Sequence, residues 1–252
     1  MTVETREYSV ARRRLIFRDS LTLLSLLLAT GVLFAVTLFL FRSFTAHRQE
    51  LAQRWSQRGQ AALQTGRPDE AVAALRTALA YAPEERAYEL LLAQALGEAG
   101  HVEESYNYFL GLWDTEPGSG FIDLRLARLA AKKNDVQGAV NYYRAAIYGT
   151  WEGDGTVRRR EVRLELAQYL MAHGEADSAR TELLVAGGNN PGDVAFRLTL
   201  AGLLEQAGDP GDALAYYRKV LGQEPRNQTA LAGVGRLEFE AESPKTMEPS
   251  SR

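Results

Sequence analysis

One short segment of the sequence gathers residue types that bind ions. Residues 149–160, GTWEGDGTVRRR, place Glu152 and Asp154 between glycines and end in three successive arginines. Acidic residues among glycines suggest a calcium loop, but the ligand spacing and the closing glutamate of such a loop are missing. The arginines could contact an anion or form the solvated start of a helix. The segment is therefore a candidate binding loop, and the alternative is a hinge between two helical elements.

The composition excludes several functional classes. Because the chain has no cysteine, disulfides, thiolate catalysis and cysteine metal sites are ruled out. The three histidines, His47, His101 and His173, stand far apart and match no metal-ligand spacing. Motifs of serine hydrolases, zinc proteases and phosphate-binding loops are absent. With 29 Lys+Arg against 32 Asp+Glu, no basic surplus exists for nucleic acid. We expect a non-enzyme without metal, cofactor or small-molecule substrate.

An uncharged apolar segment lies near the N-terminus. Leu21–Phe41 contains no charged residue. At about 1.5 Å per helical residue this length matches the roughly 30 Å hydrocarbon core of a bilayer. The segment predicts a transmembrane helix over residues 21–41. The alternatives are a buried core helix and a cleaved signal peptide, whose apolar region usually has only about 7 to 15 residues.

The arginines on the two sides of this segment predict its orientation. Cytoplasmic flanks of membrane helices carry an excess of positive charge. Residues 12–20 hold four arginines and residues 42–50 hold two. We therefore expect residues 1–20 to be cytoplasmic, the helix to lie in the plasma (inner) membrane, and the domain that follows to be extracytoplasmic. The arginines concerned are Arg12, Arg13, Arg14 and Arg18 before the segment, and Arg42 and Arg48 after it.

The elements that follow recur with a period of 34 residues. Gly66 and Gly100 are separated by this interval, and so are Gly174 and Gly208. Repeats that start at residues 52, 86, 120, 160 and 194 align a small residue with a leucine or aromatic residue four positions later. These pairs are Ala71 and Leu75, Ser105 and Phe109, Ala139 and Tyr143, Ala179 and Leu183, and Ala213 and Tyr217.

This pattern resembles the tetratricopeptide repeat family, whose repeat is a helix-turn-helix. The first repeat carries the family signature at Trp55, Gly59, Gly66, Ala71, Leu75, Ala78 and Pro83. The third repeat departs from it, with Asn134 in place of the turn glycine and Trp151 in place of the closing proline. The resemblance implies an all-α fold, an α-solenoid of about five repeats over residues 52–240, and this solenoid follows the transmembrane helix predicted from the apolar segment. Residues 228–240 predict a capping helix, and residues 241–252 predict a disordered tail.

The resemblance also implies where a partner binds. In the family the first helices of successive repeats line a concave groove that holds peptides or extended segments. Carried over to this sequence, the groove is rich in amides and has a leucine stripe that packing between helices could equally explain. The polar groove positions that packing does not explain are Gln60, Gln94, Arg128, Lys132 and Gln168.

These patterns together predict a membrane-anchored scaffold of the bacterial cell envelope that binds a protein or an extended peptide. One alternative is a periplasmic chaperone or assembly factor for envelope proteins. Another is a non-catalytic accessory subunit of an envelope enzyme complex. Recognition by the groove and recognition by the insert at residues 149–160 both remain open at this stage.

Overall fold

The computed structural model describes residues 4–188 and 192–242, with side chains from residue 24 onward. Over these ranges the regular secondary structure is α-helical, apart from one isolated bridge between Ser119 and Thr150. The chain forms two compact units, residues 1–95 and 96–252. Most of the tail expected from residue 241 lies outside the described residues.

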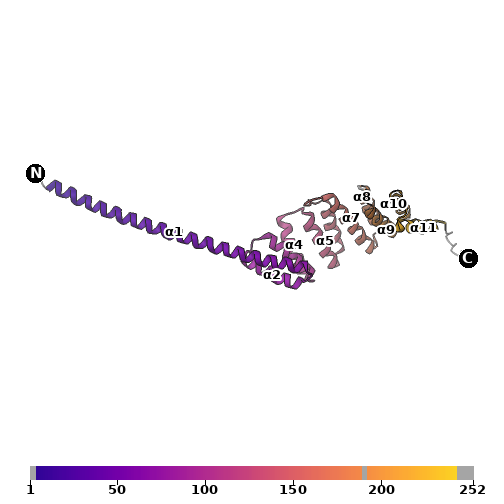
Figure 1. Cartoon of the computed structure of the whole chain (residues 1–252), viewed down its shortest axis with the longest axis horizontal. Helices are drawn as coiled ribbons and strands as arrows, with labels where there is room; N and C mark the ends of the chain where they lie inside the picture. The colour runs from indigo at the N-terminus through magenta and orange to yellow at the C-terminus, as the bar shows by residue number, and fades with distance from the viewer. Residues whose placement is uncertain (1–3, 189–191, 243–252) are drawn as a thin grey trace. The chain divides into compact units, whose positions relative to one another are not determined.

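The first unit is built on one long helix. α1 (Glu4–Gln64) runs without a break from the apolar segment into the first helix of the first repeat, and α2 (Pro68–Tyr81) follows it (Figure 1). α3 (Arg86–Glu98) begins in this unit, and its last three residues belong to the second. The apolar part of α1 has a mean hydropathy of 2.5 and is not buried, so it is long and apolar enough to cross a membrane. A signal sequence near an N-terminus can also have this length and hydropathy.

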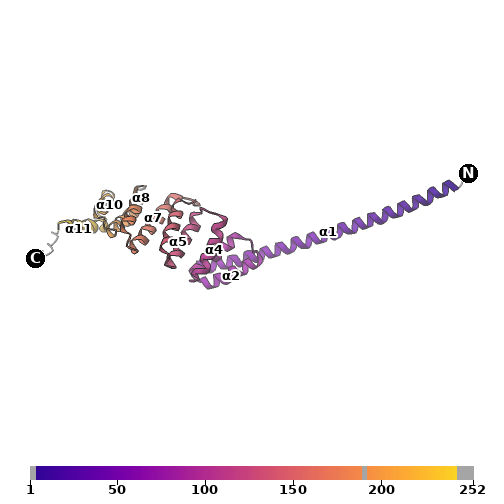
Figure 2. The same cartoon turned by 180° about the vertical axis from the view of Figure 1, so that it is seen from behind.

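Close packing joins α2 to the C-terminal part of α1 (Figure 2). A Cβ atom built on Gly59 of α1 would lie 2.6 Å from Cγ of Leu75 on α2, so only glycine allows this approach. One end of the pair is fixed near Arg48, whose guanidinium donates to the carbonyl oxygen of Ala80 at 3.3 Å. The first repeat thus continues directly from the apolar part of α1, without a linker between them.

The second unit consists of helices that follow one another in chain order (Figure 1). α5 packs with α6, α7 with α8 and α9 with α10, and α11 packs against α10. This arrangement confirms the predicted all-α fold of helix-turn-helix repeats with a final capping helix. The elements are α4 (Val102–Thr115), α5 (Gly120–Lys132), α6 (Val136–Tyr148), α7 (Gly155–Ala172), α8 (Ala176–Gly188), α9 (Val194–Gln206), α10 (Pro210–Gln223) and α11 (Gln228–Glu242).

The turns inside the repeats use the left-handed backbone region. The turn glycines have positive φ angles, for example 67° at Gly66 and 82° at Gly174. Asn134 adopts a φ of 60° at the corresponding place in the third repeat. Asparagine tolerates this conformation better than most other residues. The departure from the family pattern at this position therefore leaves the turn intact.

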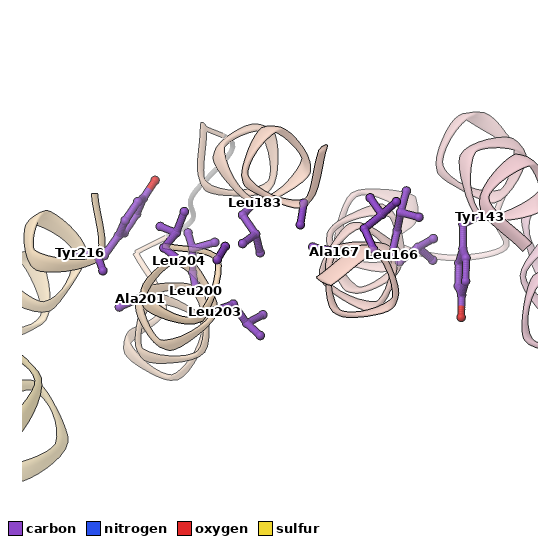
Figure 3. Close-up of a cluster of buried hydrophobic side chains, with 14 of the residues drawn as sticks. Tyr143, Leu166, Ala167, Leu183, Leu200, Ala201, Leu203, Leu204 and Tyr216 are labelled. Atoms are coloured by element: carbon purple, nitrogen blue, oxygen red, sulfur yellow. The ribbon is translucent and has the colours of Figure 1, made fainter. Parts of the chain in front are cut away.

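The core of the second unit lies between the paired helices. Leu166, Leu183 and Leu200, from three successive helices, are fully buried and are shown in Figure 3. Small residues at one position of each first helix, among them Ala167 and Ala201, have no exposed surface. Because these alanines are small, neighbouring helix backbones approach closely while the leucines fill the remaining space.

Two helix ends differ from the sequence expectation. α7 begins at Gly155, five residues before the repeat start placed at residue 160, because the Asp154 side chain accepts hydrogen bonds from the backbone N–H groups of Thr156 and Val157. α11 extends to Glu242, so the first two residues of the expected disordered tail are helical. Both differences lengthen helices of the predicted array.

Residues 45–252, expressed without the apolar part of α1, are expected to be soluble and almost wholly helical. Every described element of this range is a helix, and the buried leucines of the second unit lie within it. Circular dichroism should show double minima of helix and a cooperative thermal transition. A spectrum dominated by strand or coil would contradict this expectation.

Candidate partner-binding surface

The five polar residues predicted to contact a partner are divided between the two units. Gln60 on α1 and Gln94 on α3 belong to the first unit, and Gln94 is half-buried. Arg128 and Lys132 on α5 and Gln168 on α7 belong to the second unit, and all three are exposed. The candidate surface described below is therefore the part formed by α5 and α7 within the second unit.

Arg128 contacts the neighbouring repeat. Its Nε and Nη2 atoms donate to the two carboxylate oxygens of Glu165 on α7, both at 2.7 Å. The Tyr143 hydroxyl on α6 donates to the same carboxylate at 2.8 Å. Arg128, Tyr143 and Glu165 thus connect α5, α6 and α7 through side-chain hydrogen bonds. The Arg128 guanidinium, which was predicted to contact a partner, is therefore paired with a carboxylate of the same chain.

A second cluster repeats this arrangement at the end of the array. Arg236 on α11 donates to both oxygens of Glu205 on α9 at 2.6 and 2.9 Å, and the Tyr217 hydroxyl donates to Glu205 at 3.2 Å. Sequence reasoning missed both clusters. A signal existed: Arg128 and Arg236 each stand ninth from the start of their repeat or cap, and the two tyrosines share another repeat position.

The first cluster favours the ionised form of its carboxylate. Burial raises the pKa of Glu165, but the hydrogen bonds from Arg128 and Tyr143 and the charge of Arg128 outweigh burial, so the pKa lies below its usual value. Burial, followed by the hydrogen bond to Glu165, raises the pKa of the Tyr143 hydroxyl. The cluster therefore holds a carboxylate, a guanidinium and a neutral phenol at neutral pH.

Replacing Glu165 by glutamine is expected to destabilise the protein by about 1 kcal/mol at pH 7, because the ion pair is partly exposed. A lowered folded-state pKa gives stability that is present above the unfolded-state pKa and disappears as pH falls through the folded-state value. The difference from wild type should therefore shrink toward zero as the pH falls below about 4. Urea melts at several pH values would measure it. Glu161→Gln, which removes an exposed pair with Arg158 on the same helix, is the control, and an equal loss there would contradict the prediction.

The remaining polar residues of this surface lie beside half-buried leucines. Lys132 donates to the carbonyl oxygen of Gly97 at 3.3 Å from an exposed position, and Gln168 is exposed one turn after Glu165. The leucine stripe is partly explained by packing, because Leu124, Leu164 and Leu198 contact the buried core while keeping some exposed surface. The first helices of the second unit thus present amide and ammonium groups next to partly apolar surface.

The insert at residues 149–160 is fixed to the start of α5. Thr150 exchanges two backbone hydrogen bonds with Gly118 and Gly120, both at 2.8 Å. The Trp151 ring lies against Gly120, where a Cβ atom would be 2.4 Å from the indole, and its Nε1 atom donates to the Ala146 carbonyl oxygen at 2.9 Å. These contacts support the interpretation of the insert as a structural connection. Within the described ranges no group of three or more His, Asp or Glu residues is arranged to hold a metal ion.

These paired helices define a repeat protein whose first helices expose polar groups. The family model of the tetratricopeptide repeat matches residues 56–117, 164–228 and 198–245, which together exceed half of the chain. The chain belongs to the tetratricopeptide repeat family. This fold supports protein–protein interaction, and members of the family bind protein or peptide partners.

Solved structures share this fold at low sequence identity. The chain is similar to PilF of Pseudomonas aeruginosa, with a TM-score of 0.56 and 17% identity over 78% of this chain and 86% of that one. A MamA protein gives a TM-score of 0.53 and 17% identity over 79% and 99% of the two chains. YrrB, described as having an unusual peptide-binding site, gives 0.50 and 16% over 75% and 96%. No curated protein matches the sequence. At these identities the similarity concerns the fold.

Proposed function

We propose that this chain is a membrane-anchored, non-catalytic scaffold of the bacterial cell envelope, which binds an extended segment of a partner protein along α5, α7 and α9, the first helices of the repeats in the second unit. The observation that carries the proposal is the set of exposed polar side chains on α5 and α7, which lie beside half-buried leucines of α5, α7 and α9. Amide side chains both donate and accept hydrogen bonds, so they can pair with the backbone of an extended peptide. The leucines would contribute apolar contact at the same surface.

The anchor in this proposal is the apolar part of α1. Its length and hydropathy suit a membrane span, and the excess of arginines before it favours a cytoplasmic N-terminus. Fusions of an export-dependent and a cytoplasm-dependent reporter after residue 240 test this orientation. We expect activity of the export-dependent reporter, and activity of the cytoplasmic one would move the binding domain to the other side of the membrane.

Crosslinking in native membranes followed by mass spectrometry tests partner binding. The double variant Lys132→Ala with Gln168→Ala should capture the partner at least tenfold less, which corresponds to about 1.4 kcal/mol. Its helical signal and melting temperature should stay close to wild type, because both side chains are exposed. One stoichiometric partner is expected, whereas many weakly captured proteins would indicate a chaperone.

The matched control removes one amide and one cation from α6, which is the second helix of the third repeat. Gln137 and Arg144 are exposed on α6, and their double replacement by alanine should leave capture unchanged. If this control reduces partner capture and the Lys132→Ala, Gln168→Ala variant does not, the proposal that the partner binds along the first helices is wrong.

A further inference from the structure

The fifth repeat lacks a long side chain that the two preceding repeats carry at the same place. The ninth position holds Arg128 in the third repeat and Gln168 in the fourth, but Gly202 in the fifth. A Cβ atom built on Gly202 would have only the Tyr217 hydroxyl within 4 Å, at 3.9 Å. The first-helix surface therefore has free space at α9 where its neighbours have side chains.

This space is part of an open hollow between α9 and α11. Its volume is about 540 Å³, within the range of small ligand sites. Five side chains and one glycine surround it, and they come from α9, α10 and α11. The lining residues are Gly202, Glu205, Gln206, Tyr217, Arg236 and Glu240.

The wall of the hollow is held in place by the second cluster. Arg236 binds both oxygens of Glu205, and the Tyr217 hydroxyl donates to the same carboxylate. The hydrogen bond from Arg236 lowers the pKa of Glu205 and outweighs the opposing effect of burial, so this group is a carboxylate at neutral pH. The side chains of Glu205, Tyr217 and Arg236 are therefore already held in position before a ligand group binds.

The charge of the hollow is negative. Glu205 and Glu240 supply two carboxylates against the single guanidinium of Arg236, and Glu240 is exposed one turn after that arginine. Gln206 adds an exposed amide at the rim. A cationic side chain entering here would reduce the local repulsion, whereas a third carboxylate would increase it.

We infer that this hollow receives a lysine or arginine side chain of the partner segment. The aliphatic stem of that side chain lies over Gly202, near the Tyr217 hydroxyl, and its charged end lies between Glu205 and Glu240. The inference rests on the proposed function, since it names a side chain of the segment that binds along the first helices. It adds that the end of this segment over α9 and α11 is basic.

Selection of displayed random 12-residue peptides on the full chain in lipid nanodiscs, after removal of binders to empty nanodiscs, tests the inference. Peptides selected on wild type should carry Lys or Arg at one aligned position at least threefold above the library frequency. Changing that residue to glutamine in a selected peptide should weaken binding to wild type at least tenfold, as measured by fluorescence anisotropy.

Three variants connect this preference to the hollow. Gly202→Gln restores the side chain of the fourth repeat and fills the space, and Glu240→Gln removes a negative charge. Each should abolish the basic preference without changing the helical signal. Glu238→Gln, on the same helix and paired with Arg218, should retain the preference.

The outcomes separate this inference from the proposed function. Peptides that bind without a basic preference, or with one that survives Gly202→Gln, contradict the inference and leave peptide binding in place. Failure to select any peptide on wild type contradicts both.

Discussion

Replacing Leu183 by alanine is expected to lower the free energy of unfolding of the 45–252 fragment by about 2 to 5 kcal/mol. Leu183 has no exposed surface and lies on α8, among side chains of α7 and α9 (Figure 3). The substitution removes these contacts and leaves a cavity that helix packing can close only in part. Chemical denaturation followed by circular dichroism would measure the loss.

The adjacent residue provides the control for this prediction. Leu184 is on the same helix but is 41% exposed. Leu184→Ala removes the same atoms from a position that touches little of the core, so it should cost less than about 1 kcal/mol. Equal losses for the two leucines would mean that α8 does not pack as described.

Replacing Trp151 by alanine is expected to cost about 2 to 4 kcal/mol, somewhat less than for a fully buried aromatic residue. Trp151 is half-buried, its ring covers Gly120, and its indole N–H donates to Ala146. Its loss would leave the carbonyl oxygen of Ala146 without this donor and expose the start of α5. Thermal and urea unfolding of the fragment would measure the change.

Two further variants separate the contribution of the Trp151 ring from that of its N–H donor and from that of the neighbouring residue. Trp151→Phe keeps a ring over Gly120 without the N–H donor, so it should recover part of the stability. Glu152→Ala changes the exposed neighbour and should have little effect. A large loss for Glu152→Ala together with none for Trp151→Ala would contradict the structural role of the insert.

The anchoring of the insert also affects how its part in recognition is tested. A deletion of residues 153–157 removes the start of α7, because Gly155 begins that helix. Such a deletion would disturb the fold, and lost binding could not be assigned to lost contacts. Alanine at the exposed residues Glu152 and Arg158 tests recognition without this complication.

The repeat architecture could be predicted from the sequence because it depends on local signals. Turn glycines such as Gly66 and proline positions such as Pro83 recur with the period, and small residues mark where helices approach. These signals act within about 34 residues and need no knowledge of neighbouring repeats. Even Asn134, which departs from the family pattern, is a residue type that tolerates the required backbone conformation.

The use of individual polar side chains could not be predicted in the same way. Arg128 was expected to contact a partner, but its carboxylate partner Glu165 is 37 residues away, in the next repeat. Which side chains meet across repeats depends on how the repeats stack, and the period alone does not give that geometry. The space at Gly202 was missed for the same reason, since a glycine on a helix indicates free space only when its neighbours are known.

Because α1 is one unbroken helix, the first repeat has a fixed rotation about the helix axis relative to the apolar segment. Each added helical residue turns the following chain by about 100° and advances it by about 1.5 Å. Inserting one alanine between residues 42 and 51 would therefore rotate the α2 side of α1 by more than a quarter turn about the helix axis. Inserting seven would return it nearly to its original direction, about 10 Å farther along the axis. If partner capture in membranes falls with one inserted alanine and recovers with seven, α1 is a rigid helix that determines the direction in which the first repeat faces.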